Sequence, residues 1–202
     1  MGKGSRTITK TEKSVQQYIN QLHDQNSKLL VLRVDFGYTK EHCENMKLSD
    51  IKRDIKHMLD NRRGKSKLFE HQEGYVMKFE HTPQKGPHVH ALLLYNGQKV
   101  KKDGYLAEEV GRYWKENITK GKGLYHNCNF NKSDYEQCGI GMIDHTNTNK
   151  RAALLDKVVP YMLKKEQSID SIKDTIDERS VTKGIITSHT SNAGRPRIQN
   201  LQ

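Results

Sequence analysis

The stretch GYVMKFEHTPQKGPHVHALLLYN, residues 74–96, decides the fold of this chain. Two runs rich in apolar and β-forming residues, Gly74–His81 and His88–Asn96, flank the segment Thr82–Pro87, which contains two prolines and a glycine. Such runs on both sides of a turn-forming segment are typical of a β-hairpin. The stretch therefore predicts two neighbouring antiparallel strands.

The segments around this hairpin complete an α+β pattern. A buried strand is expected before it, and helices with apolar residues three and four apart are expected on both sides. The middle of the chain then has the order β-α-β-β-α-β, which folds as an antiparallel sheet with two helices on one face. The further elements are predicted as strands at Lys28–Gly37, Gly123–Phe130 and Cys138–His145, and as helices at Thr11–Gln25, Leu48–Arg62, Tyr105–Ile118, Lys150–Glu166 and Ile169–Ile176.

Length and composition indicate one domain without a membrane span. The 202 residues suit a single domain over 11–186, with flexible ends at 1–10 and 187–202. No apolar run approaches the roughly 18–20 residues that cross a bilayer, and the basic first residues, MGKGSRTITK, are unlike a secretory signal. Three cysteines are an odd number and do not suggest a disulfide framework. We expect a soluble cytoplasmic protein.

The charge indicates a polyanionic partner. There are 35 Lys and Arg against 24 Asp and Glu, a net charge of +11, and basic side chains that meet phosphates release condensed counterions. The basic residues are interleaved through predicted helices and strands, which favours a binding face on a folded domain. The residues expected to follow a nucleic-acid backbone are Arg33, Lys52, Arg62, Arg63, Lys120, Lys122 and Lys165.

The hairpin also carries a candidate metal site. Residues i and i+2 of a strand face the same side, so His88 and His90 project together, about 6–7 Å apart, while Val89 points to the opposite layer. Glu80 stands across the turn and offers a carboxylate oxygen, with His81 as the rival for this place. Two imidazoles and one carboxylate bind a divalent metal and leave positions open for a phosphate oxygen and water.

A second candidate lies downstream, in the helical segment VVPYMLKK at 158–165. Tyr161 and Lys164 are three residues apart and share a helix face, and Lys165 could stand in for Lys164. A tyrosine hydroxyl can attack a phosphodiester and keep the 5′-phosphate as a covalent ester. Because its ordinary pKa is near 10, a nearby cation or metal helps it to ionise.

These blocks resemble the HUH endonucleases, which nick single-stranded DNA in rolling-circle replication, conjugation and some transposition. The segments VLRVDFGY, GPHVHALLLYNG, YWKENITKGKG and PYMLKK are similar to the single-tyrosine replication proteins of filamentous phages and phage-like elements, and the resemblance covers Leu29–Lys165. Asp35 falls in the first motif, where a structural, DNA-contacting or catalytic role is open. The resemblance implies His88 and His90 as the metal pair, Glu80 as the third ligand, Tyr161 as the nucleophile and Lys164 as the lysine one turn along.

The resemblance implies a mechanism and partners. Mg²⁺ or Mn²⁺ polarises the scissile phosphate, and Tyr161 attacks it to form a 5′-phosphotyrosyl link and a primer 3′-hydroxyl. The partners are single-stranded DNA at an origin, as a linear or hairpin strand, and a host helicase, with the protein a monomer or weak dimer. Tyr38, Tyr95 and Trp114 are candidates for stacking on bases, with Trp114 also suited to the core. The helix has one tyrosine, so a full replication round needs another subunit or the released 3′-hydroxyl.

Other interpretations stay open at this level. A non-catalytic nucleic-acid-binding regulator would use the same sheet with structural histidines, and a conjugative or mobilisation relaxase would share the nicking chemistry. His126, Cys128 and Cys138 could hold zinc, although the spacing is unlike known zinc motifs. The tail sequence GRPR, residues 194–197, is similar to the core of a minor-groove AT-hook.

Overall fold

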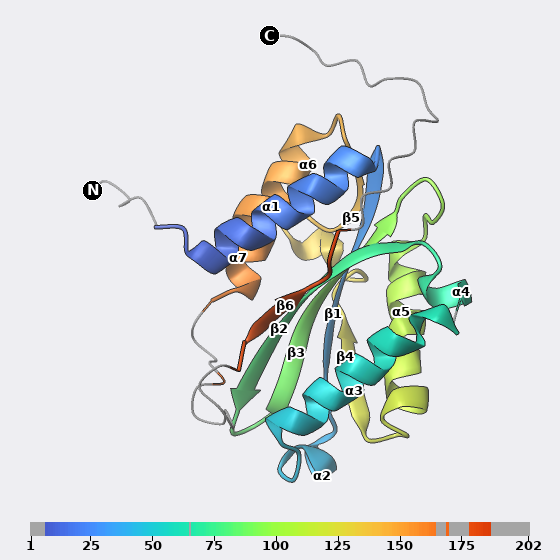
Figure 1. The fold of residues 1–202 in the computed structure, drawn as a ribbon, viewed down its shortest axis with the longest axis vertical. Helices are drawn as coiled ribbons and strands as arrows, with labels where there is room; N and C mark the ends of the chain where they lie inside the picture. The colour runs from blue at the N-terminus through green and yellow to red at the C-terminus, as the bar shows by residue number, and fades with distance from the viewer. Residues whose placement is uncertain (1–6, 65, 165–168, 170–177, 187–202) are drawn as a thin grey trace.

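The protein is an α+β structure built on an antiparallel sheet, as the sequence predicts, and the described part of the chain contributes six strands to it. The computed structural model describes residues 7–64, 66–164, 169 and 178–186 (Figure 1). No helix in this described part is long and apolar enough to cross a membrane. The strands are β1 (Lys28–Tyr38), β2 (Gln72–Thr82), β3 (Gly86–Asn96), β4 (Gly123–Asn127), β5 (Gly141–Asp144) and β6 (Val181–Lys183).

The sheet has the strand order β4-β1-β3-β2-β6. The central strand β3 pairs along its length with β1 and with β2, and the β2–β3 pair is the predicted hairpin. Two strands share the outer edge of β1: β4 pairs with Val34–Tyr38, and β5 pairs with Lys28–Val31. Two long strands therefore flank β3, and both reach the end of the sheet where the hairpin turns.

The helices are connected in the predicted order, β-α-β-β-α-β, through α3 and α5. Thr9 begins α1 by accepting a hydrogen bond from the Glu12 amide with its hydroxyl, at 3.2 Å. The predicted helix over Lys150–Glu166 is divided, because a π-helical turn separates α6 from the short α7. The helical segments are α1 (Lys10–Gln25), α2 (Lys40–Cys43), α3 (Leu48–Asp60), η1 (Asn61–Arg63), α4 (Ser66–Phe69), α5 (Asp103–Tyr113), η2 (Trp114–Ile118), η3 (Lys132–Asp134), α6 (Thr148–Ala153), η4 (Leu154–Val158) and α7 (Val159–Met162).

One face of the sheet is covered by α3 and α5, and we call it the α3–α5 face (Figure 1). Every second residue of each strand points to this face because the side-chain period of a strand is two. Helix α3 contributes apolar residues at helical spacing, so its buried stripe matches the sheet. The core of this face includes Leu32, Val34, Phe36, Val89, Leu93, Ile51, Ile55, Met58, Val110 and Trp114.

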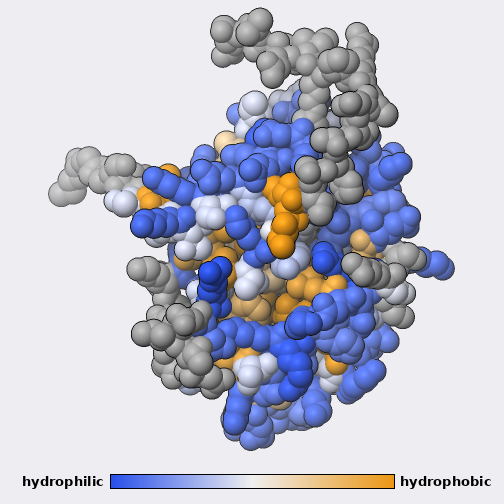
Figure 2. All heavy atoms as spheres, in the orientation of Figure 1, coloured by the Kyte–Doolittle hydropathy of each residue, from blue (hydrophilic) through white to orange (hydrophobic). Residues whose placement is uncertain are grey.

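The opposite face is covered at one end by α1, η4 and α7, and we call it the α1–α7 face. Leu29 and Val31 of β1 pack there against the helices. The next residues of the same period, Arg33 and Asp35, are polar and lie beyond the apolar cluster. In Figure 2, hydrophilic side chains cover most of the visible surface, and apolar side chains gather in a band between α1 and α3. The polar end of the α1–α7 face is where the candidate site lies.

Several details differ from the sequence expectations. Strand β4 ends at Asn127 rather than Phe130, and β6 was not predicted because its sequence, VTK, is short and polar. Tyr38 and Tyr95 are buried at 4% and 1% exposure, so neither can stack on a base as expected; Trp114 is buried in the core. The predicted helix at Ile169–Ile176 and the tail at 187–202 lie outside the described residues, except for Ile169, which is buried.

Candidate metal centre and nucleophile

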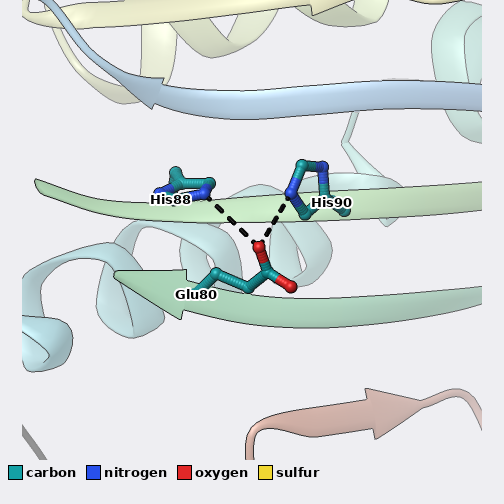
Figure 3. Close-up of side chains that lie close together, drawn as sticks. All are labelled: Glu80, His88 and His90. Carbon is teal, nitrogen blue, oxygen red and sulfur yellow. Dashed lines mark hydrogen bonds and ion pairs between the residues drawn. The ribbon is translucent and has the colours of Figure 1, made fainter. Parts of the chain in front are cut away.

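Three donor groups converge where the β2–β3 hairpin approaches its turn (Figure 3). Glu80 and His88 are direct partners in the β2–β3 register, and His90 lies one period along β3 on the same face. Glu80 Oε2 is 3.6 Å from His88 Nε2 and 3.1 Å from His90 Nε2. The candidate ligand atoms all lie within 4.8 Å of one another, which suits a single ion. Val89 points into the opposite core, as its alternation predicts.

The second ring nitrogen of each histidine has its own partner. His88 Nδ1 lies 3.0 Å from the Gly86 carbonyl oxygen, and His90 Nδ1 lies 2.7 Å from Asp35 Oδ1. Partners of this kind fix the ring orientation and leave Nε2 for a metal. The donor set therefore fits a divalent ion such as Mn²⁺ or Mg²⁺. Asp35, whose role the sequence left open, lies where it can orient His90.

The electrostatics of the cluster favour charged groups. Burial by itself raises the pKa of Glu80, but its contacts with His88 and His90 outweigh it and lower the pKa to about 2. Burial alone would lower the pKa of His90, yet its close contacts with the carboxylates of Asp35 and Glu80 raise it to about 9. Asp35 has a lowered pKa because its contact with His90 outweighs its burial. A metal must therefore displace a proton from His90.

Glu80, and not His81, belongs to the cluster. Glu80 is buried and shares the α1–α7 face with the two histidines. His81 is the next residue on β2, so it points to the other side of the strand. The buried Lys78 shares the face of Glu80 and lies opposite His90 in the register. Its positive charge helps to lower the pKa of Glu80.

Tyr161 lies on α7, at the border of the same sheet face. Its side chain is 56% exposed, and two cations approach its ring. The Arg33 guanidinium carbon and Lys164 Nζ each lie 5.0 Å from the ring centroid. Lys164 lies just beyond α7, as the Tyr161–Lys164 pair predicted from the sequence requires. Arg33, from the middle of β1, is a second cation beside the ring that the sequence did not indicate.

Two hollows that share lining residues lie beside Tyr161 and beside the two histidines. One, of about 440 Å³, is lined by Arg33 and Tyr161; the other, of about 350 Å³, is lined by His88 and His90. Asp35 and His126 line both hollows. These two residues are direct partners in the β1–β4 register. Tyr161 and the two histidines therefore line hollows that meet at Asp35 and His126.

The basic residues predicted to contact DNA are scattered. Lys52 lies on α3, over the opposite sheet face, with its Nζ 2.7 Å from Glu178 Oε1. The Arg62 guanidinium lies 5.5 Å from the Tyr75 ring centroid. Among these residues, only Arg33 lines a hollow of the site; its contact with DNA and that of the others remain predictions. Lys120 and Lys122 are exposed in the turn before β4, whereas Lys165 and the side chain of Arg63 lie outside the described part.

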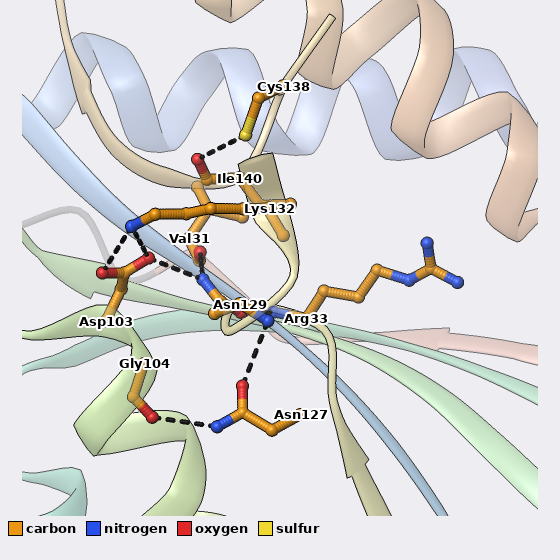
Figure 4. A network of polar contacts seen from close by, with 9 residues as sticks. All are labelled: Val31, Arg33, Asp103, Gly104, Asn127, Asn129, Lys132, Cys138 and Ile140. Carbon is orange, nitrogen blue, oxygen red and sulfur yellow. Dashed lines mark hydrogen bonds and ion pairs between the residues drawn. The ribbon is translucent and has the colours of Figure 1, made fainter. Parts of the chain in front are cut away.

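A polar network behind the site was not foreseen (Figure 4). Asn129 is buried at the gap between β4 and β5, where it accepts a hydrogen bond from the Arg33 amide at 2.8 Å and donates to the Val31 carbonyl at 3.0 Å. It also donates to Asp103, which Lys132 contacts at 2.7 Å. The Asn129 side chain thus makes the hydrogen bonds to β1 that a neighbouring strand would otherwise make at this position. The only sequence signal was that polar residues interrupt the predicted strand at Gly123–Phe130.

The same loop brings Tyr135 to the hollow of Tyr161, a position that sequence spacing could not indicate.

The zinc alternative gains no support, since the described residues contain one potential metal cluster and neither Cys128 nor Cys138 belongs to it. Burial raises the pKa of the Cys128 thiol to about 12, so it stays protonated.

The fold and site define a class: an α+β protein with a split β-α-β-β-α-β sheet and a possible Glu-His-His metal cluster on its polar face. A family model described as the YagK/YfjJ C-terminal domain matches residues 3–176, and the chain belongs to this family. No curated protein and no solved structure matches the chain.

Proposed function

We propose that the protein is a metal-dependent endonuclease that nicks and rejoins single-stranded DNA and so initiates rolling-circle replication at an origin. The main support is that Tyr161 lines one hollow and His88 and His90, which cluster with Glu80, line a second hollow, and that the two hollows share Asp35 and His126. The sequence resemblance to HUH endonucleases and the net charge of +11 support the same choice.

In this reaction Tyr161 is the nucleophile. Its hydroxyl oxygen attacks the phosphorus in line, the bond to the 3′-oxygen breaks, and a 5′-phosphotyrosyl ester forms. The tyrosine gives up its proton, and the leaving 3′-oxygen gains one. One phosphodiester replaces another, so the reverse reaction rejoins the strand without a further energy source. Arg33 and Lys164 place positive charge beside the ring whose oxygen reacts.

The cluster supplies the electrophilic half of the site. A divalent cation bound by Glu80, His88 and His90 would polarise the phosphate and offset its negative charge. Asp35 and the Gly86 carbonyl hold the two imidazoles so that both Nε2 atoms face Glu80. The role of Asp35 is thus positional, because it acts through His90.

The test is covalent trapping. The protein is incubated with a labelled pool of single-stranded DNA and Mn²⁺, with and without EDTA, and resolved on a denaturing gel. We expect an adduct that EDTA and Tyr161→Phe abolish and that Tyr135→Phe, in the same hollow, retains. An adduct that survives Tyr161→Phe would reject the proposed nucleophile. Binding of the pool without any adduct would favour a non-catalytic nucleic-acid-binding regulator.

A further inference from the structure

The candidate groups are arranged in order along β1. Tyr161 packs against Arg33, and Asp35, two residues further along, contacts the metal ligand His90. Further along β1, toward its C-terminal end, Phe36 pairs with Val89 of β3. Gly37 therefore lies beside His88. The metal cluster is thus level with residues 35–37. Tyr161 lies on the Arg33 side of it, because its hollow is lined by Arg33, Cys128 and Ile140 and by none of residues 36–40.

Two lysines lie beyond the metal cluster, on the side away from Tyr161. Lys40 follows the end of β1, and Lys85 lies in the turn between β2 and β3, past Glu80 and His88. Both are exposed and line the hollow that also contains His88 and His90. On the other side, Lys157 is exposed and lines the hollow that contains Tyr161. Each hollow therefore has its own basic residues.

We propose, resting on the nicking function above, that this order fixes the polarity of the bound DNA. The DNA segment that ends in the leaving 3′-oxygen lies in the hollow of Lys40 and Lys85. The segment that becomes linked to Tyr161 through its 5′-phosphate lies in the hollow of Lys157.

The geometry of displacement leads to this assignment. The attacking and leaving oxygens stand roughly in line on opposite sides of the phosphorus. Tyr161 approaches from the Arg33 side of the metal cluster, so the 3′-oxygen departs toward the end of β1. A strand carrying that oxygen meets the ammonium groups of Lys40 and Lys85, which can neutralise its phosphates. After cleavage these lysines would retain the released 3′ end for rejoining.

A binding experiment tests the polarity without any cleavage. The probes are two short oligothymidylates, one with a terminal 3′-phosphate and one with a terminal 5′-phosphate, each with a fluorophore at its other end. In Mn²⁺, the terminal phosphate of each probe should bind at the metal cluster. The 3′-phosphorylated probe can then extend only into the hollow of Lys40 and Lys85, and the 5′-phosphorylated probe only into the hollow of Lys157. Fluorescence anisotropy gives the affinity of each at several salt concentrations.

We expect a reciprocal result. The double variant Lys40→Gln/Lys85→Gln should weaken binding of the 3′-phosphorylated probe and reduce its salt slope by about 1.4, since each phosphate contact with a single strand contributes about 0.7. Its affinity for the 5′-phosphorylated probe should stay unchanged, and Lys157→Gln should show the opposite preference. Lys56→Gln, at an exposed lysine of α3 over the α3–α5 face, should change neither.

Two results overturn the inference: equal losses for both probes in the double variant, or no loss for either. The covalent trapping assay decides the proposed function separately. Trapping without reciprocal binding would retain the nickase and reject the polarity, whereas reciprocal binding without trapping would retain the polarity and reject the nickase.

Discussion

Substitution of Asn129 tests how the fold supports the site. Its side chain is 2% exposed and bonds the Arg33 amide and the Val31 carbonyl, the two groups of β1 that face the gap between β4 and β5. Asn129→Ala leaves both groups buried without these partners. Each buried group left unpaired costs about 1–3 kcal/mol, so we expect the free energy of unfolding to fall by about 3 kcal/mol.

Urea unfolding followed by circular dichroism measures this loss, and the unfolding temperature should drop by about 6–12 °C for a chain of this size. Asn131→Ala is the matched control, because Asn131 is exposed in the same loop; it should change stability by less than about 0.5 kcal/mol. Since Arg33 packs against Tyr161, Asn129→Ala should also slow adduct formation. A variant as stable as the wild type would refute the role assigned to this network.

Four further predictions concern the metal cluster and the packing of α5 on the sheet. Because the pKa of His90 is raised to about 9, Mn²⁺ binding at pH 7 should release about one proton. The affinity for Mn²⁺ should rise with pH up to about 9. Calorimetry in buffers of different ionisation enthalpy measures both effects. Stability that the metal-free protein gains from His90 should be complete below about pH 6.5 and lost as pH rises through about 9; a flat profile would contradict this. Glu80→Gln should weaken Mn²⁺ binding at least tenfold, measured by calorimetry, because it removes the only carboxylate of the cluster. Unchanged Mn²⁺ affinity would show that Glu80 is not a metal ligand. Gly111→Ala should destabilise the fold by about 1–3 kcal/mol in urea unfolding, since a Cβ there would overlap the Tyr125 ring.

The sequence could predict the hairpin and the grouping of Glu80, His88 and His90 because both follow from local rules. Strand alternation places His88 and His90 on one face, and the short turn brings Glu80 beside them. The alternation also identifies Glu80 rather than His81 as the residue on that face, although the sequence interpretation left the choice open. Trp114 is buried because it belongs to the apolar stripe of its helix.

Features that depend on distant segments were beyond the sequence. Lys52 belongs to a basic cluster in the chain, yet its ion pair with Glu178 joins residues 126 positions apart. A tyrosine is amphipathic and can lie at the surface, so its type alone did not predict burial of Tyr38 and Tyr95. Both point to the α3–α5 face, where the packed helices bury them. Asn129 fills a gap that exists only because two separate strands share one edge of β1. Tertiary contacts determine each of these positions.

The most direct test of the account is to locate the DNA on the protein. The adduct formed in Mn²⁺ is digested with nuclease and trypsin, and mass spectrometry identifies the peptide that carries a nucleotide. We predict a nucleotide 5′-phosphate on the peptide VVPYMLK, residues 158–164, whose one tyrosine is Tyr161; His88→Ala and His90→Ala should abolish it. A nucleotide on another tyrosine, such as Tyr135, or the same adduct without the two histidines, would contradict the account.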